Sequence, residues 1–145
     1  MLVALIAAIL AAVAPAEAAH LTERPKKHKV VYHLNEPSVD KARFVLGNIQ
    51  NHIDGVGGMK NVEAIELVVH GPALRNFLTK DMNPDIKRAL DELKSQGVGF
   101  EACGNTMKAF SITLEQLPPG TKPLPQGGVV RVMELQEQGY VYIRP

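Results

Sequence analysis

VEAIELVVH, residues Val62 to His70, is the stretch that points most directly to a fold class. Ile65, Leu67, Val68 and Val69 make it nearly continuously apolar. A strand with one face in water alternates apolar and polar residues, whereas a strand of a parallel sheet is covered on both faces and shows an uninterrupted run. This stretch therefore predicts a parallel sheet with helices packed on both sides.

Segments typical of strands and helices alternate on both sides of this run. Before it come a strand at Lys29 to Leu34 and a helix capped by Ser38 and ended by Gly55. After it come a short helical piece at Ala73 to Leu78, a helix that starts at Asn83-Pro84-Asp85 and stops at Gly97, and a strand at Val98 to Cys103. The alternation predicts a three-layer α/β/α domain with a mainly parallel sheet of about five strands, flavodoxin-like in outline.

The C-terminal part adds two further helices and two short strands. We predict a helix at Asn105 to Ile112 that continues through Thr113 to Leu117, a brief strand at Lys122 to Leu124, a helix at Val129 to Gln138 and a last strand at Tyr140 to Arg144. Between them, Pro118 to Gly128 is rich in proline and glycine. Loops of that length usually have a functional or interfacial role.

The N-terminus has the pattern of a secretory signal peptide. Met1 to Ala14 is an uninterrupted apolar run, and Pro15 to Ala19 supplies the small residues of a cleavage site. A transmembrane helix needs about 20 apolar residues, so a membrane anchor is the less favoured alternative. We expect a signal peptide at residues 1–19, a basic arm at 20–28, one domain at 29–145, and a periplasmic or secreted protein.

Composition excludes several classes of protein. The chain of 145 residues is 46% hydrophobic and 21% charged, with 16 Lys and Arg against 15 Asp and Glu. Nucleic-acid binding requires a clustered excess of basic residues, which this balance does not supply. The single cysteine, Cys103, also excludes an intramolecular disulfide.

The carboxyl ends of the predicted strands locate the candidate site, because ligands of open α/β sheets bind at that edge. The first strand is followed there by polar residues, the second ends at a histidine, and the third ends at the cysteine. The candidate residues are His33, Asn35 and Glu36; His70 and Gly71; and Cys103 with Gly104, Asn105 and Thr106.

Cys103 is the candidate nucleophile. It ends a strand directly before a predicted helix, where unpaired backbone N–H groups and the helix dipole favour an anion. A thiol in that position has a lowered pKa and is more reactive. The alternative is a buried cysteine that packs as a small apolar side chain.

His33 and His70 could converge on Cys103 in either of two ways. One is a cysteine and histidine pair that activates the thiol, and the other is a metal site formed by His33, His70 and Cys103. Both histidines could instead be structural, and Glu36 could complete a metal site or simply begin a turn. A nucleotide is disfavoured because the first loop contains Glu36 and Pro37 where a phosphate needs bare backbone N–H groups.

Three segments together resemble the DsrE/DsrF-like family, and more closely its exported subgroup. They are KVVYHLNE from Lys29, VGFEACGNTM from Val98 to Met107, and the tail GVVRVMELQEQGYVYIRP. The resemblance implies a DsrEFH-like α/β/α fold, frequent homo-oligomers and, in members that hold a persulfide on a cysteine, sulfur-carrier chemistry. Cys103 stands at the position that resembles that site.

The expected function is therefore that of a candidate sulfur carrier or sulfurtransferase that holds a persulfide on Cys103. Its partners would be copies of itself and a sulfur donor or acceptor, either a protein or a small thiol. We expect no cofactor, no nucleic acid and no membrane after cleavage. The alternative is a non-catalytic periplasmic binding or oligomeric assembly module that holds a small ligand or metal at the strand ends.

Overall fold

The structure is a computed structural model that describes residues 27–145. The predicted signal peptide at 1–19 and most of the basic arm at 20–28 lie outside the described residues. Within 27–145, no helix combines the length and the apolar character needed to cross a bilayer.

The described residues form a five-stranded sheet in which every pair of neighbours is parallel. The strand order is β4-β3-β2-β1-β5, so the apolar run that begins at Val62 lies at the centre. This confirms the predicted parallel α/β sheet. The strands are β1 (His28–Leu34), β2 (Val62–Val69), β3 (Gly99–Cys103), β4 (Lys122–Leu124) and β5 (Val141–Ile143).

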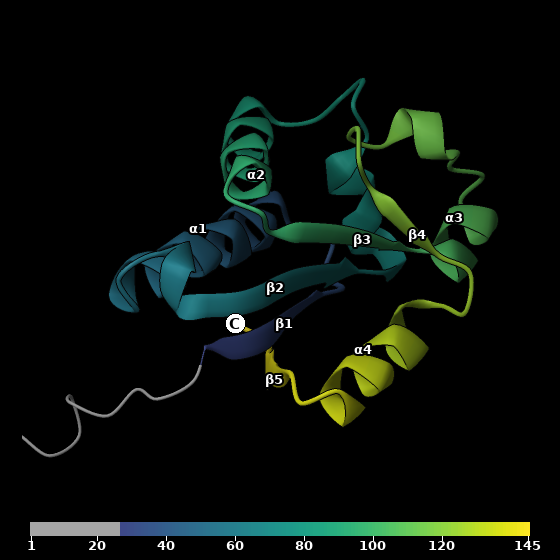
Figure 1. Ribbon diagram of the computed structural model, residues 1–145. Coiled ribbons are helices and arrows are strands. Elements are labelled where there is room, and N and C mark those ends of the chain that lie inside the picture. The colour runs from purple at the N-terminus through teal and green to yellow at the C-terminus, as the bar shows by residue number, and fades with distance from the viewer. Residues whose placement is uncertain (1–26) are drawn as a thin grey trace, which may run out of the picture.

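Helices cover the two faces of the sheet unequally (Figure 1). One face packs against α1 (Val39–Gly55) and α2 (Pro84–Ser95), and the other against α4 (Gly128–Glu137). The short helix α3 (Gly104–Ala109) leaves the carboxyl end of β3. Three 3-10 turns complete the connections: η1 (Met59–Asn61), η2 (Gly71–Phe77) and η3 (Leu114–Gln116).

The apolar core is divided between these two faces, because successive side chains of a strand point to opposite sides. The α1/α2 face holds the larger core, to which β1, β2 and β3 contribute Val30, Tyr32, Leu34, Ile65, Leu67, Val69, Phe100 and Ala102. Among the described residues, the core under α4 is smaller: half-buried Tyr140 packs against the buried Val31, Val68, Leu124, Val132 and Leu135. The remaining positions on the α4 face are therefore open to polar and titratable residues.

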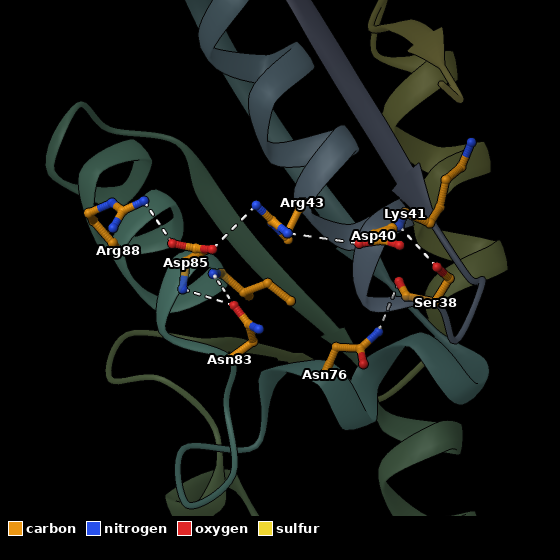
Figure 2. A network of polar contacts seen from close by, with 9 residues as sticks. Ser38, Asp40, Lys41, Arg43, Asn76, Asn83, Asp85 and Arg88 are labelled. Atoms are coloured by element: carbon orange, nitrogen blue, oxygen red, sulfur yellow. Dashed lines mark hydrogen bonds and ion pairs between the residues drawn. The ribbon is translucent and has the colours of Figure 1, made fainter.

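Capping side chains begin α1 and α2 where the sequence predicts (Figure 2). Ser38 accepts a hydrogen bond from the Lys41 amide at 3.2 Å, and Asn83 accepts one from the Asp85 amide at 2.9 Å. Arg43 of α1 reaches Asp85 of α2 at 3.3 Å and joins the two helix starts. Exposed ion pairs of this kind contribute little free energy, so the caps and the core beneath them hold these helices.

The predicted helix after Cys103 is too long, because α3 ends at Ala109 and does not continue through Leu117. Ser111 adopts a left-handed conformation with φ 53°, and the Ile112 amide donates to the Met107 carbonyl at 2.8 Å. These are the features of a Schellman termination, here with serine where glycine is usual. Thr113 then starts the separate turn η3 with its own capping box.

Candidate functional site

At the carboxyl ends of three neighbouring strands, one side chain from each end lies on the α4 face of the sheet. His33, His70 and Cys103 lie two residues beyond Val31, Val68 and Glu101 of β1, β2 and β3, and positions two apart share a face. The predicted convergence of strand ends is therefore found for these three residues.

A cavity of about 370 Å³ opens beside Cys103. It lies between the end of β2, the start of α3 and the loop that leads into α4. Five of the lining residues are sequence-predicted, and seven are further ones. The lining residues are His70, Gly71, Cys103, Asn105, Thr106, Ala109, Phe110, Gln126, Gly127, Gly128, Val129 and Val130.

The pKa of the Cys103 thiol is lowered from its ordinary value. The side chain is only 5% exposed, and this burial acts to raise the pKa. The Thr106 hydroxyl, as a hydrogen-bond donor, and the nearby backbone N–H groups of Gly128, Thr106 and Asn105 lower the pKa and together outweigh the burial. These donors stabilise the thiolate, which is the nucleophilic form of cysteine.

Thr106 is held in the orientation that its hydrogen bond to Cys103 requires. Its Oγ1 accepts a hydrogen bond from the Gly71 amide at 2.8 Å, and its side chain is buried. A hydroxyl can donate one hydrogen, and the bond from the Gly71 amide does not use that hydrogen, because the Thr106 oxygen is the acceptor there. The hydroxyl hydrogen is therefore free to point at the sulfur.

Two glycines allow the surrounding backbone to approach the cysteine closely. A Cβ on Gly128 would lie 3.1 Å from the His70 Cβ and 3.3 Å from the Cys103 Cβ. A Cβ on Gly104 would lie 2.6 Å from the Leu124 carbonyl oxygen. Gly128 brings the start of α4 onto the thiol, and Gly104 lets the start of α3 lie against β4.

His33 and His70 stack on each other, with ring centroids 4.7 Å apart and planes inclined by 16°. The Nδ1 of His33 shares a hydrogen bond with the Tyr142 hydroxyl at 2.8 Å. Burial lowers the pKa of His33 to about 4, with smaller contributions from His70 and Arg144, and burial followed by Arg144 lowers the pKa of His70. Both rings are therefore neutral at pH 7.

The Nε2 atoms of both stacked histidines are buried and have no hydrogen-bond partner. His70 lines the cavity, while His33 lies behind it and is not a lining residue. The predicted role of these histidines in activating the thiol stays a prediction, because the groups that lower the pKa of Cys103 are Thr106 and the three backbone amides.

The remaining predicted residues do not line the cavity. The Asn35 Oδ1 accepts a hydrogen bond from the Arg144 Nη2 at 3.0 Å, and the Glu36 carboxylate lies 3.6 Å from the same guanidinium. Gly104 has the packing role described above. Across residues 27–145, no three His, Cys, Asp or Glu side chains are grouped so that they could hold a metal ion, and the alternative metal site of His33, His70 and Cys103 stays a prediction.

Sequence reasoning missed the contribution of the α4 start. Gln126 to Val130 supply five lining residues, and Tyr142 of β5 holds His33. A signal was present, since the irregular segment Pro118 to Gly128 has the length of a functional loop and ends in a glycine pair. No pattern along the chain, however, indicates that this loop returns to the end of β3.

Comparison with solved structures supports the fold. A protein of unknown function, MTH1491, from Methanobacterium thermoautotrophicum is similar at 27% identity and a TM-score of 0.73, covering 82% of this chain and all of that one. The ychN protein from E. coli shares 16% identity with a TM-score of 0.63, covering 81% of this chain and 99% of that one. At that identity the likeness concerns the fold alone.

A third structure, the conserved protein of unknown function BT1422 from Bacteroides thetaiotaomicron, shares 14% identity with a TM-score of 0.59, covering 81% of this chain and 94% of that one. A comparison with curated proteins found no match. The model of the DsrE/DsrF-like family matches residues 28–145, which include every strand and helix described above. The chain therefore belongs to the DsrE/DsrF-like family.

Proposed function

We propose that this protein is a sulfur carrier that holds sulfane sulfur as a persulfide on Cys103. The observation that carries the proposal is the set of hydrogen-bond donors around the sulfur: Thr106 and three backbone amides lower the pKa of the thiol, although burial acts against them. A cysteine that served only as an apolar core residue would need no such donors. The adjoining cavity gives a small sulfur compound or an exposed partner thiol a place to meet it.

The chemistry consists of two thiol exchange steps. In loading, the Cys103 thiolate attacks the outer sulfur of a donor persulfide, the donor S–S bond breaks, and the donor leaves as a thiolate. In handover, the thiolate of an acceptor attacks the outer sulfur on Cys103, and the electron pair of the broken S–S bond returns to the Cys103 sulfur. The sulfane sulfur keeps its oxidation state, so neither step needs an oxidant or a reductant.

The same donors serve both steps. They keep Cys103 in the thiolate form that attacks the donor, and they stabilise that thiolate again when it is the leaving group of handover. A low leaving-group pKa speeds the second step, because exchange rates rise as the leaving thiol becomes more acidic. The environment of Cys103 is thus suited to a carrier that must both accept and release sulfur.

The proposal extends to location and assembly. The apolar N-terminal run supports export, which would place the carrier in the periplasm or outside the cell. Val129, Val130 and Met133 of α4, with Val141 and Tyr142 of β5, are exposed apolar side chains. Patches of this kind mark contact surfaces, and we assign this one to contacts between copies of the chain.

Light scattering tests the assembly. Wild type should have the mass of an oligomer, and Met133→Glu, which places a charge in the patch, should shift the mass toward that of one chain. A wild-type protein that is monomeric across the concentration range would contradict this part of the proposal and leave the chemistry of Cys103 untouched.

Mass spectrometry tests the carrier function directly. The purified protein is treated with sodium polysulfide, desalted and weighed intact. We expect a gain of about 32 Da, one sulfur atom on one thiol, that is lost after addition of a small acceptor thiol. Because Cys103 is the single cysteine of the chain, Cys103→Ser removes every competing thiol and should show no adduct.

Alkylation supplies the second arm. Iodoacetamide should modify Cys103 in the folded protein, with a rate that depends on pH. A folded wild-type protein that gains no sulfur and reacts with iodoacetamide only after denaturation would overturn the proposal. That outcome would favour a binding or assembly module with a packed cysteine.

A further inference from the structure

A buried ion pair joins α4 to β3 close to the thiol. The Glu101 side chain is 1% exposed and that of Arg131 is 14% exposed. Arg131 Nε donates to Glu101 Oε2 at 2.8 Å, and Nη2 donates to Oε1 at 2.9 Å. A bidentate guanidinium and carboxylate pair restricts both distance and orientation, which apolar packing does not do.

Cys103 and Gly128 meet at the thiol. Glu101 is separated from Cys103, and Arg131 from Gly128, in the same direction. Glu101 precedes Cys103 by two residues on the same face of β3, a spacing of about 6.6 Å along a strand. Arg131 follows Gly128 by three residues in α4, about 4.5 Å along a helix and nearly on the same side. Pairing Arg131 with Glu101 therefore places Gly128 over Cys103.

Stability alone does not account for this pair. Removing a carboxylate and a guanidinium from water costs free energy that their attraction only partly returns, and well-packed apolar residues often stabilise a fold as well or better. The core under α4 consists of few residues, so apolar contacts by themselves leave the helix free to shift along the sheet. The ion pair therefore contributes a defined position of α4 relative to β3.

We propose that Glu101 and Arg131 are positioning residues: their ion pair fixes the first turn of α4 against β3 and so holds the Gly128 amide on the sulfur of Cys103. A Cβ on Gly128 would lie 3.1 Å from the His70 Cβ and 3.3 Å from the Cys103 Cβ, so the helix start that the ion pair fixes lies directly against the cysteine. The inference rests on the proposed function for its biological meaning, but the thiol can be titrated in the absence of any sulfur donor.

Other charged and titratable groups face the pair from the surrounding elements. Lys122 Nζ of β4 lies 2.9 Å from Glu101 Oε1, and its side chain is largely exposed. Burial, followed by the charge of Glu101, raises the pKa of Glu66 on β2. Glu134 lies one turn further along α4, Tyr140 follows the helix, and His70, directly after β2, lines the same cavity as Cys103.

The test measures the pKa of the Cys103 thiol from the pH dependence of its alkylation by iodoacetamide, with thermal unfolding of each variant recorded beside it. Arg131→Lys keeps the charge but loses the bidentate geometry. Glu101→Met with Arg131→Met replaces both charges by apolar side chains and avoids a lone buried charge. We expect each to raise the thiol pKa by about one unit, or tenfold less thiolate below the pKa.

Lys122→Met is the matched control, because it removes the other cation of Glu101 without touching α4, and it should leave the thiol pKa unchanged. Gly128→Ala disturbs the helix start directly and should raise the pKa at least as much as the Arg131 variants. If Arg131→Lys and the double variant are folded and keep the wild-type pKa, the proposal is wrong. If the thiol pKa rises only in the double variant, then the charges of the pair and not the position of α4 set that pKa, and the proposal is equally wrong.

The two proposals fail independently. A protein that takes up no sulfur, but whose thiol pKa rises in the Arg131 variants, retains the positioning role and loses the carrier function. If the protein is loaded with sulfur but the thiol pKa is unchanged in these variants, the carrier function stands and the positioning role is wrong.

Discussion

The two faces of the sheet are built from the same strands but have different contents. On the α1/α2 face, β3 contributes Phe100 and Ala102 to the larger core. On the α4 face, the same strand contributes Glu101 and Cys103, one paired with Arg131 and the other surrounded by hydrogen-bond donors. The period of two along a strand lets one face supply folding free energy while the other carries titratable groups. Stability and the environment of the thiol can therefore be altered separately in this protein.

Phe100→Ala removes a large side chain from the larger core and should have the largest effect on the free energy of unfolding. Phe100 is buried and packs against Phe77, with ring centroids 4.9 Å apart. Truncating a buried phenylalanine leaves a cavity and costs about 3–5 kcal/mol of unfolding free energy. Urea unfolding measures the loss. In the folded fraction the thiol pKa of Cys103 should stay at its wild-type value, and a rise would show that the faces are coupled.

Gly104→Ala tests the close approach of α3 to β4. The new Cβ would lie 2.6 Å from the Leu124 carbonyl oxygen, so the backbone must move, at a cost of about 1–3 kcal/mol. Gly47→Ala in α1 is the matched control, because nothing lies within 4 Å of its Cβ position. It should stabilise the protein by about 0.5–1 kcal/mol. Equal effects of the two substitutions in thermal unfolding would contradict this account of Gly104.

Acid should destabilise the α4 face through its histidines. The pKa of His33 is about 4 in the folded protein and 6.5 when unfolded, so the unfolded chain binds protons more readily between these values. The stability that neutral His33 provides is complete above pH 6.5 and is lost as the pH falls toward about 4.

We expect this loss to be roughly 1–3 kcal/mol, measured by urea unfolding at pH 7 and pH 4.5. His33→Phe keeps an aromatic ring stacked on His70 but cannot be protonated. Carboxylates titrate equally in both proteins, so the difference in pH dependence isolates His33. An identical pH dependence in the variant and in wild type would refute the prediction.

Thr106→Val should have the smallest effect on stability and a clear effect on the thiol. It removes the hydroxyl that bonds Cys103 and leaves the Gly71 amide without its acceptor, at a cost of about 1 kcal/mol. The thiol pKa should rise by up to about one unit. Thr106→Ser restores the hydroxyl and should restore the pKa, as alkylation across pH will show. A serine variant that behaves like the valine variant would assign the effect to packing.

Much of the fold could be predicted from patterns along the chain. The central strand at Val62, the caps at Ser38 and Asn83 and the short strand at Lys122 all follow from local signals. The end of α3 could not be predicted, because the left-handed conformation of Ser111 is a residue-specific exception to a position where glycine is usual.

The candidate site could be predicted only in part. The rule that sites lie at strand carboxyl ends locates His70, Cys103 and Thr106 correctly at one cavity. The same rule selects Asn35 and Glu36, which instead meet Arg144 near the C-terminus. It misses Gly128, whose contact with Cys103 spans a loop of irregular structure that no periodicity describes.

Patterns along the chain predict the three layers and the position of one thiol at the carboxyl edge of the sheet, because both depend on periodicity and caps that act over a few residues. The surroundings of that thiol, in contrast, depend on tertiary contacts. The donors from Gly128 and Thr106, the stacked histidines and the Glu101 and Arg131 pair join residues far apart in the chain. Such contacts arise from packing α4 and the strand ends together, which local sequence patterns do not specify.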